Sequence, residues 1–174
     1  SSMTEIQALL LIKSILESAD IHGIENILAE DCEYMSTGRG IIGRNRNESI
    51  EFLSSMTESI KADNVPVTCK VMHITDVYEE DALFHEGRHG LTVSYESSDN
   101  YVYMIFVDVN DEGLVDRIVS SQENYSIEYD DLRFGDDESE YAFISAPTTV
   151  KDWITALSMW LPPEIGRASC RERV

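Results

Sequence analysis

The sequence predicts one α+β domain, residues 3–127, in which helices come first and antiparallel strands follow. Up to about residue 62, apolar side chains recur every three or four positions, whereas from residue 67 they alternate with polar ones. The chain has 174 residues, of which 43% are hydrophobic, so one ordinary core can form. The expected order is helix, helix, strand, helix and four strands, followed by a C-terminal helix.

Three helices are expected in the first third of the chain. Residues 4–19 carry a wide apolar stripe, and Asp20 is a suitable cap for a second, shorter helix that reaches about residue 28. The short β-prone run CEYMST and the glycine-rich loop GRGIIGR come next. Asn47 is the expected cap of a third helix, which ends near residue 62 because Asn64 and Pro66 stop it.

Four long strands are expected in residues 67–78, 82–95, 101–109 and 114–126. The first of them alternates strictly. Because Lys70 and Asp76 require water, His73 on the opposite row is predicted to face inwards.

The last part of the chain changes in composition. Residues 128–148 are strongly acidic and predict a solvated linker, whereas residues 149–162 carry a bulky apolar stripe and predict a C-terminal helix that packs on the domain or binds a partner. The basic end, EIGRASCRERV, resembles a translated sequencing adapter, so residues 164–174 are expected to be non-native.

The net charge of the chain limits the classes of partner that it can bind. Thirteen Lys and Arg against 33 Asp and Glu give a net charge of −20, and such a surface repels nucleic acid and anionic membranes. The apolar run ALLLI is too short to span a bilayer and has no features of a secretion signal. Three cysteines without metal-ligand spacing indicate a reduced, cytoplasmic protein with inert thiols.

Two motifs suggest metal sites, and both are interpreted as accidental. His85, Glu86 and His89 fit H-E-x-x-H, but on a strand the two histidines would lie roughly 13 Å apart, too far to share a zinc ion. The acidic run 108–119 matches part of a calcium-binding loop, but Val119 stands where a bidentate glutamate is required, and a hairpin turn explains the run. No metal or other cofactor is therefore expected.

The order of elements resembles the nuclear transport factor 2-like superfamily. The likeness covers about residues 5–127 and rests on ILAEDCEY where the second helix gives way to the first strand, a GR-containing loop, NESIEFL at the third helix and VDVNDEGLVDRI at the last hairpin. The resemblance implies a cone-shaped domain, in which a strongly bent antiparallel sheet wraps around three N-terminal helices and leaves an apolar pocket. Ketosteroid isomerases, SnoaL-like polyketide cyclases, dehydratases and non-catalytic binding modules share that fold.

The resemblance also implies where a site would lie. The general base of the isomerases corresponds to a position near Ser36, and their tyrosine on the first helix has no counterpart in residues 4–19, so steroid isomerisation is not expected. The residues expected to line the pocket are Tyr34, His73, His85 and Tyr103. His73 is the candidate general acid or base, and a core histidine bonded to a backbone carbonyl is the alternative.

Three functions remain open on the sequence. The first is a pocket protein that binds a small apolar or amphipathic metabolite, the second is a lyase or isomerase that uses His73, and the third is an acidic protein-interaction or inhibitor module. Arg39 and Arg44 are candidates to bind a substrate carboxylate or to pair with nearby acids. A homodimer through the outer face of the sheet is also expected, over a row of apolar side chains: Met72, Ile74, Met104 and Phe106.

Overall fold

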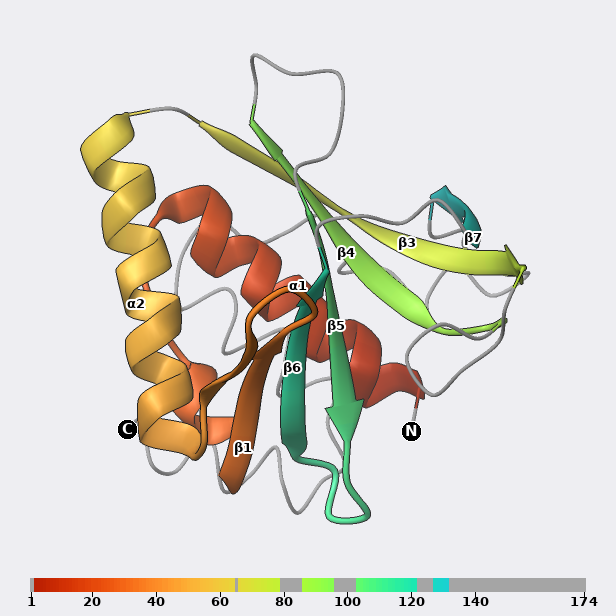
Figure 1. Cartoon of the computed structure of the whole chain (residues 1–174), viewed down its shortest axis with the longest axis horizontal. Coiled ribbons are helices and arrows are strands. Elements are labelled where there is room, and N and C mark those ends of the chain that lie inside the picture. Colours follow the sequence, from red (N-terminus) through yellow and green to blue (C-terminus); the bar gives the residue numbers. More distant parts are fainter. Residues whose placement is uncertain (1, 65, 79–85, 96–102, 122–126, 132–174) are drawn as a thin grey trace.

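The computed structural model describes residues 2–64, 66–78, 86–95, 103–121 and 127–131. They form a mixed α+β structure, in which two α-helices lie on one side of a curved seven-stranded sheet (Figure 1). The predicted C-terminal helix, the predicted non-native tail and His85 lie outside the described residues.

The first helix forms as expected, and the second is much shorter than expected. Helix α1 spans Ser2–Ser18. In place of the second helix there is one turn of 3-10 helix, Ile24–Asn26. The backbone turns away after α1 because Ala19 and Gly23 both have positive φ, at 53° and 70°, and β1 already begins at Leu28. The segment between the end of α1 and the start of β1 is therefore long enough for only one helical turn.

Helix α2 spans Arg46–Asp63, and its N-cap is Asn45 and not Asn47 as the sequence suggested. The Asn45 side-chain oxygen accepts a hydrogen bond from the backbone N–H of Glu48 at 3.0 Å, and the Asn45 amide donates to the Glu48 carboxylate at 3.0 Å. The first bond satisfies a free N–H group of the first turn, and the second holds the two side chains together. At the other end, Asn64 adopts a left-handed conformation with φ 51°, which ends the helix as predicted.

The sheet has the order β2-β1-β6-β5-β4-β3-β7. Its strands are β1 (Leu28–Ser36), β2 (Gly40–Gly43), β3 (Val67–Val77), β4 (His89–Tyr95), β5 (Tyr103–Val109), β6 (Val115–Ser121) and β7 (Ile127–Asp131). The central pairs are antiparallel as expected, but β1 and β6 run parallel, so the prediction of a wholly antiparallel sheet is wrong at this pair. The two strands are far apart in sequence, and local alternation carries no information on their relative direction.

Two edge strands were not predicted. Strand β2 lies in the loop GRGIIGR, where Ile41 is 44% exposed, and it pairs only with β1 among the strands. Strand β7 pairs with β3 and includes residues 128–131, which were expected to be linker. Its exposed residues Glu128 and Asp130 are typical of an edge strand that is kept from pairing with other chains.

Around the H-E-x-x-H motif, the described backbone contains no helix. Gly87 has φ 89° and its N–H donates to the carbonyl of Ile74, while the N–H of Ile74 donates to the carbonyl of Arg88. Two residues of one strand thus face one residue of the other, which is a G1-type β-bulge, and β4 begins directly after it at His89. At the other suspected motif, the Asn110 side chain accepts from the N–H groups of Glu112 and Leu114, which confirms a hairpin turn between β5 and β6.

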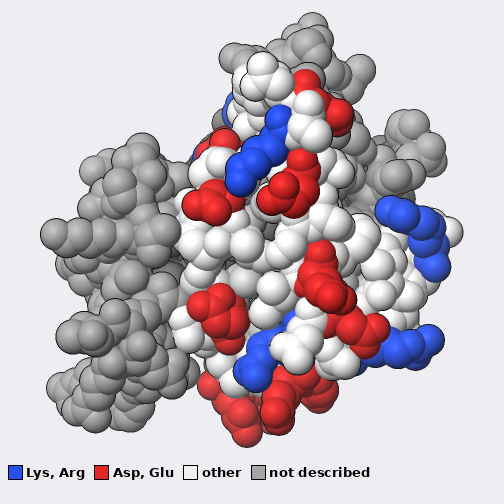
Figure 2. Space-filling view, turned by 90° about the vertical axis from the view of Figure 1, so that its left-hand side faces the viewer, with Lys and Arg blue, Asp and Glu red and all other residues white. Residues whose placement is uncertain are grey.

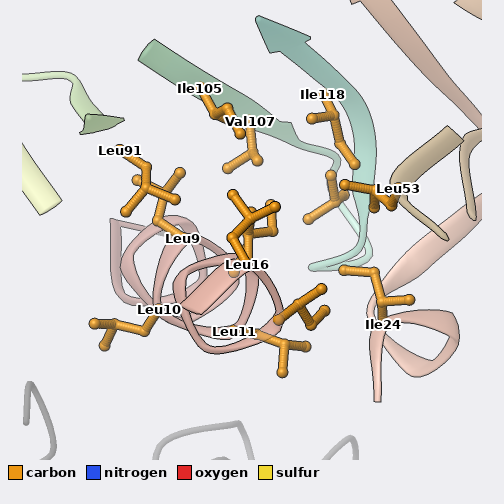
Figure 3. Packing of buried hydrophobic residues seen from close by; sticks show 14 of the residues in the cluster. Leu9, Leu10, Leu11, Leu16, Ile24, Leu53, Leu91, Ile105, Val107 and Ile118 are labelled. Carbon is orange, nitrogen blue, oxygen red and sulfur yellow. The ribbon is translucent and has the colours of Figure 1, made fainter. Parts of the chain in front are cut away.

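The main core forms between α1 and the inner face of the sheet. Figure 3 shows Leu9 and Leu16 of α1 pointing towards Leu91, Ile105 and Val107, while Leu10 and Leu11 point to the other side of the helix. Almost the whole of α1 is therefore buried, as these exposures of 3% or less show: Ile6, Ala8, Leu9, Leu10, Leu11, Ile12, Ile15 and Leu16. A helix with so wide an apolar surface requires such an interior position.

A second apolar cluster lies on the opposite face of the sheet. It contains Val119 and the four residues that were predicted to form an outer dimer row. These four are Met72, Ile74, Met104 and Phe106. All are at most 8% exposed within the single chain. Gly90 belongs to this face because a Cβ there would lie 2.8 Å from the Phe106 ring. The homodimer itself stays a prediction.

The two described cysteines, Cys32 and Cys69, are buried free thiols. Burial raises the pKa of each to about 12, so neither is a significant thiolate near neutral pH. None of the helices that the structure describes has the length and apolar character needed to cross a membrane.

The capping arrangement gives a direct test of the helix start. We expect Asn45→Ala to lower the free energy of unfolding by about 1 kcal/mol, because an N–H group of the first helical turn loses its acceptor. Asn47→Ala, two residues into the helix and exposed, is the matched control and is expected to change stability by a few tenths of a kcal/mol at most. Urea denaturation of both variants measures the difference. Equal losses would contradict the assignment of the cap.

Candidate functional site

A cavity of about 290 Å³ lies between α2 and the sheet. Strands β1, β5 and β6, the turn after β1, and one face of α2 form its wall. The lining residues are Tyr34, Ser36, Arg39, Phe52, Ser55, Met56, Ser59, Ile60, Tyr103 and Ser120. The volume lies near the lower end of ligand pockets, which is roughly 300 Å³.

Helix α2 supplies half of this wall because five of its residues share one face. Phe52, Met56 and Ile60 recur every four positions, and Ser55 and Ser59 lie beside them at the same spacing. The three larger side chains are half-buried, whereas the two serines are exposed and lie at the rim of the cavity. The helix thus presents an apolar surface edged by hydroxyl groups.

The sheet supplies the opposite wall through the inner rows of three strands. Tyr34 and Ser36 are two residues apart on β1, so their side chains point to the same face. The parallel pairing places Ser36 beside Ser120 of β6. Tyr103 enters from the start of β5. Two hydroxyls on neighbouring strands and two phenols therefore face the helix.

Tyr34 is the centre of the wall. Its ring lies 4.6 Å from the ring of Phe52, and its hydroxyl donates to the sulfur of Met56 at 3.6 Å. Burial raises the pKa of Tyr34 to about 12, although the Ser120 hydroxyl and the Arg39 guanidinium act in the opposite direction. The phenol therefore stays protonated at neutral pH and is available as a hydrogen-bond donor.

The charges around the cavity differ from those of the whole protein. Arg39 is the single charged residue among those that line it, although the chain carries a net charge of −20. On the face that α2 presents, acidic side chains gather at the lower end and cationic ones are scattered among them (Figure 2). The cavity therefore has a positive local charge within an acidic surface.

The predicted site residues that the structure describes lie in two different parts of the sheet. Tyr34 and Tyr103 line the cavity, and Ser36, at the position of the missing isomerase base, lines it as well. His73 does not line it. It lies on the same face of β3 as Val67, Cys69 and Val71, but its ring packs 5.2 Å from the ring of His89. His85 is outside the described residues, and the roles assigned to all four residues remain predictions.

His89 and Glu5 form a polar contact beneath α1. The Glu5 carboxylate accepts from the backbone N–H of His89 at 3.1 Å and lies 2.6 Å from its ring Nδ1. His89 is 9% exposed, so the contact is largely shielded from water. A carboxylate that bonds both the main chain and the ring fixes the first turn of α1 to β4 and orients the imidazole. Together with His73 this places a carboxylate and two imidazoles at the end of the sheet near the start of α1.

A second hollow, of about 510 Å³, is acidic and largely polar. Its lining residues are Asp31, Glu33, Arg44, Asp108, Val109, Asp116 and Arg117. Burial, followed by the charges of Asp108 and Asp31, raises the pKa of the Asp116 carboxyl. The predicted role as an acidic interaction module is untested by this geometry and stays a prediction.

Sequence reasoning did not find the serines of the cavity. Ser55, Ser59 and Ser120 line the cavity, and no role was predicted for them. The available signal was their spacing, since Ser55 and Ser59 follow the same four-residue period as the apolar face of α2.

Comparisons with known proteins give structural similarity only. No protein-family model matches the chain, and no curated protein matches it. A cystatin-like fold protein of unknown function from Methylobium petroleophilum PM1 is 12% identical, with a TM-score of 0.47, covering 81% of this chain and 91% of that one. An LEH-like epoxide hydrolase from M. tuberculosis is 17% identical, with a TM-score of 0.41 and coverage of 71% and 86%.

A putative isomerase of the SnoaL-like family from Agrobacterium tumefaciens is 14% identical, with a TM-score of 0.37, and covers 68% of this chain and 98% of that one. These values describe what the chain is similar to. They assign neither a family nor an activity, and the resemblance to the nuclear transport factor 2-like superfamily stays a prediction.

The contact between Glu5 and His89 predicts a loss of stability on its removal. We expect Glu5→Ala to lower the free energy of unfolding by about 1–3 kcal/mol, because a buried N–H and a buried imidazole lose their acceptor. Glu25→Ala, which removes an exposed glutamate of the 3-10 turn, is the control and should stay within about 0.5 kcal/mol. Urea denaturation at pH 7 compares them. A Glu5 variant as stable as the control would contradict a structural role.

The raised pKa of Tyr34 predicts late ionisation. In ¹³C-tyrosine NMR, the Cζ signal that disappears in Tyr34→Phe is expected to stay at its neutral position at pH 10.5, where an exposed tyrosine is largely ionised. Because the unfolded chain releases this proton near pH 10 and the folded chain near pH 12, stability must fall across that window as the pH rises. A midpoint near pH 10 for this signal would show that the phenol is open to water.

Proposed function

We propose that the protein binds a small amphipathic molecule in the cavity between α2 and the sheet. The observation that supports this is the composition of the wall, where aromatic and aliphatic side chains alternate with hydroxyl groups. Pockets for small molecules are mostly apolar and contain a few polar groups that fix the orientation of the ligand. The phenols and serines suit a ligand that offers hydrogen-bond acceptors next to an apolar body.

Binding without chemistry fits this wall better than catalysis does. No Asp, Glu, His or Cys is among the described residues that line the cavity. Proton transfer needs a group that titrates near the working pH. Tyr34, whose pKa is raised to about 12, keeps its proton at neutral pH. The alternative of a lyase or isomerase depends on His73, which packs beside His89 and away from this wall.

The test uses a neutral probe, 4-phenylbutan-1-ol, which has an aromatic body and one hydroxyl. Titrated into ¹⁵N-labelled protein, it is expected to shift the amide signals of residues around Tyr34, Met56 and Ser120 in a saturable way. Ser55→Trp should abolish these shifts, because the indole would occupy the mouth of the cavity. Ser55 is exposed, so the variant is expected to fold.

Two controls make the result specific. Glu51→Trp places the same indole one turn earlier on α2, at an exposed position that does not line the cavity, and should bind as the wild type does. His73→Ala is expected to bind equally well. Shifts that are spread over the surface, or that persist unchanged in Ser55→Trp, would refute the proposal.

A further inference from the structure

The sheet side of the cavity carries a group of hydrogen-bond donors. Arg39 follows β1 directly, and Tyr34 and Ser120 lie on the neighbouring strands β1 and β6 with their side chains on the same face. All three line the cavity, and none of them can carry a negative charge near neutral pH. Phe52, Met56 and Ile60 project from α2 across the cavity and supply its apolar surface, and Met56 reaches the Tyr34 hydroxyl.

These donors have few acceptors in the described chain. The Tyr34 hydroxyl donates to the sulfur of Met56 at 3.6 Å, a poor acceptor, and its other polar neighbour is the Ser120 hydroxyl. Arg39 forms no ion pair with any acid in the ranges that the structure describes, although acids outnumber bases by 33 to 13 in the chain. A guanidinium at the mouth of a cavity and a neutral phenol behind it match the oxygens of one carboxylate.

The negative net charge of the protein does not cancel the attraction between Arg39 and an anion in the cavity. At physiological ionic strength, charges more than roughly 8 Å apart are largely screened in water. A ligand within the cavity therefore interacts mainly with the groups that line it, and Arg39 is the charged one among them. The remaining acids lower the rate at which an anion approaches more than they lower its affinity once it is bound.

We propose that the ligand is a small monocarboxylic acid with an apolar body, held with its carboxylate at Arg39. The hydroxyls of Tyr34 and Ser120 donate to the same carboxylate, and the apolar body packs against α2. This inference rests on the proposed binding function and specifies its ligand class.

The experiment compares two probes that differ in one end group, 4-phenylbutanoate and 4-phenylbutan-1-ol. Isothermal titration of the wild type at pH 7 should give a dissociation constant about tenfold lower for the carboxylate, as expected for a charge-assisted hydrogen bond at a half-open site. Arg39→Gln should remove this difference. Its dissociation constant for the carboxylate should rise about tenfold, and its dissociation constant for the alcohol should stay unchanged. Arg44→Gln changes an exposed arginine that follows β2 and does not line the cavity, and it should keep the wild-type ratio.

Each outcome decides one of the two proposals. If the alcohol binds as tightly as the carboxylate, or if the ratio survives in Arg39→Gln, the carboxylate inference is overturned while the binding function stands. If Arg44→Gln removes the ratio as well, the effect belongs to general surface charge, and the inference fails. If neither probe binds the wild type, the binding function is refuted and the carboxylate site with it.

Discussion

The structure depends on the burial of α1 against the inner face of the sheet. Helix α1 contacts β3, β4 and β5, and its apolar residues are covered on nearly every side. A sheet must curve to enclose a helix in this way, and Figure 1 shows β3 and β4 diverging from β5 and β6 around it. Helix α2 packs against β1 and β2. The space that remains between α2 and the sheet is the cavity.

The divergence of β4 from β5 leaves backbone groups that side chains satisfy. The two strands pair at Leu91, Thr92 and Val93 of β4, and the ladder does not continue to His89. There the N–H of His89 bonds to the carboxylate of Glu5, and the carbonyl of Val107 accepts from the buried guanidinium of Arg88. Arg88 also pairs with Asp108 and lies over the ring of Phe106. Two charged residues thus replace the missing ladder bonds, which a buried backbone requires.

Alternation predicted β3 to β6 well because each of these strands has a face turned to the main core. It could not predict β2 or β7, because edge strands bury little and their acidic or glycine-rich sequences suit loops equally. The same limit applies to the site. The alternation of apolar and polar residues indicates on which face of the sheet a side chain lies, but not at which position along the sheet. Tyr34 and His73 share the inner face, yet one lies against α2 and the other near the first turn of α1.

The parallel pairing of β1 with β6 has a consequence for the order of folding. Ser36 and Ser120 are neighbours in the sheet, but the ribosome makes β2, α2, β3, β4 and β5 between them. Such distant contacts form late because a long loop must close first. A nascent chain that ends before Val115 therefore lacks the strand that completes the wall of the cavity, so the cavity cannot be complete until almost all of the described chain has emerged.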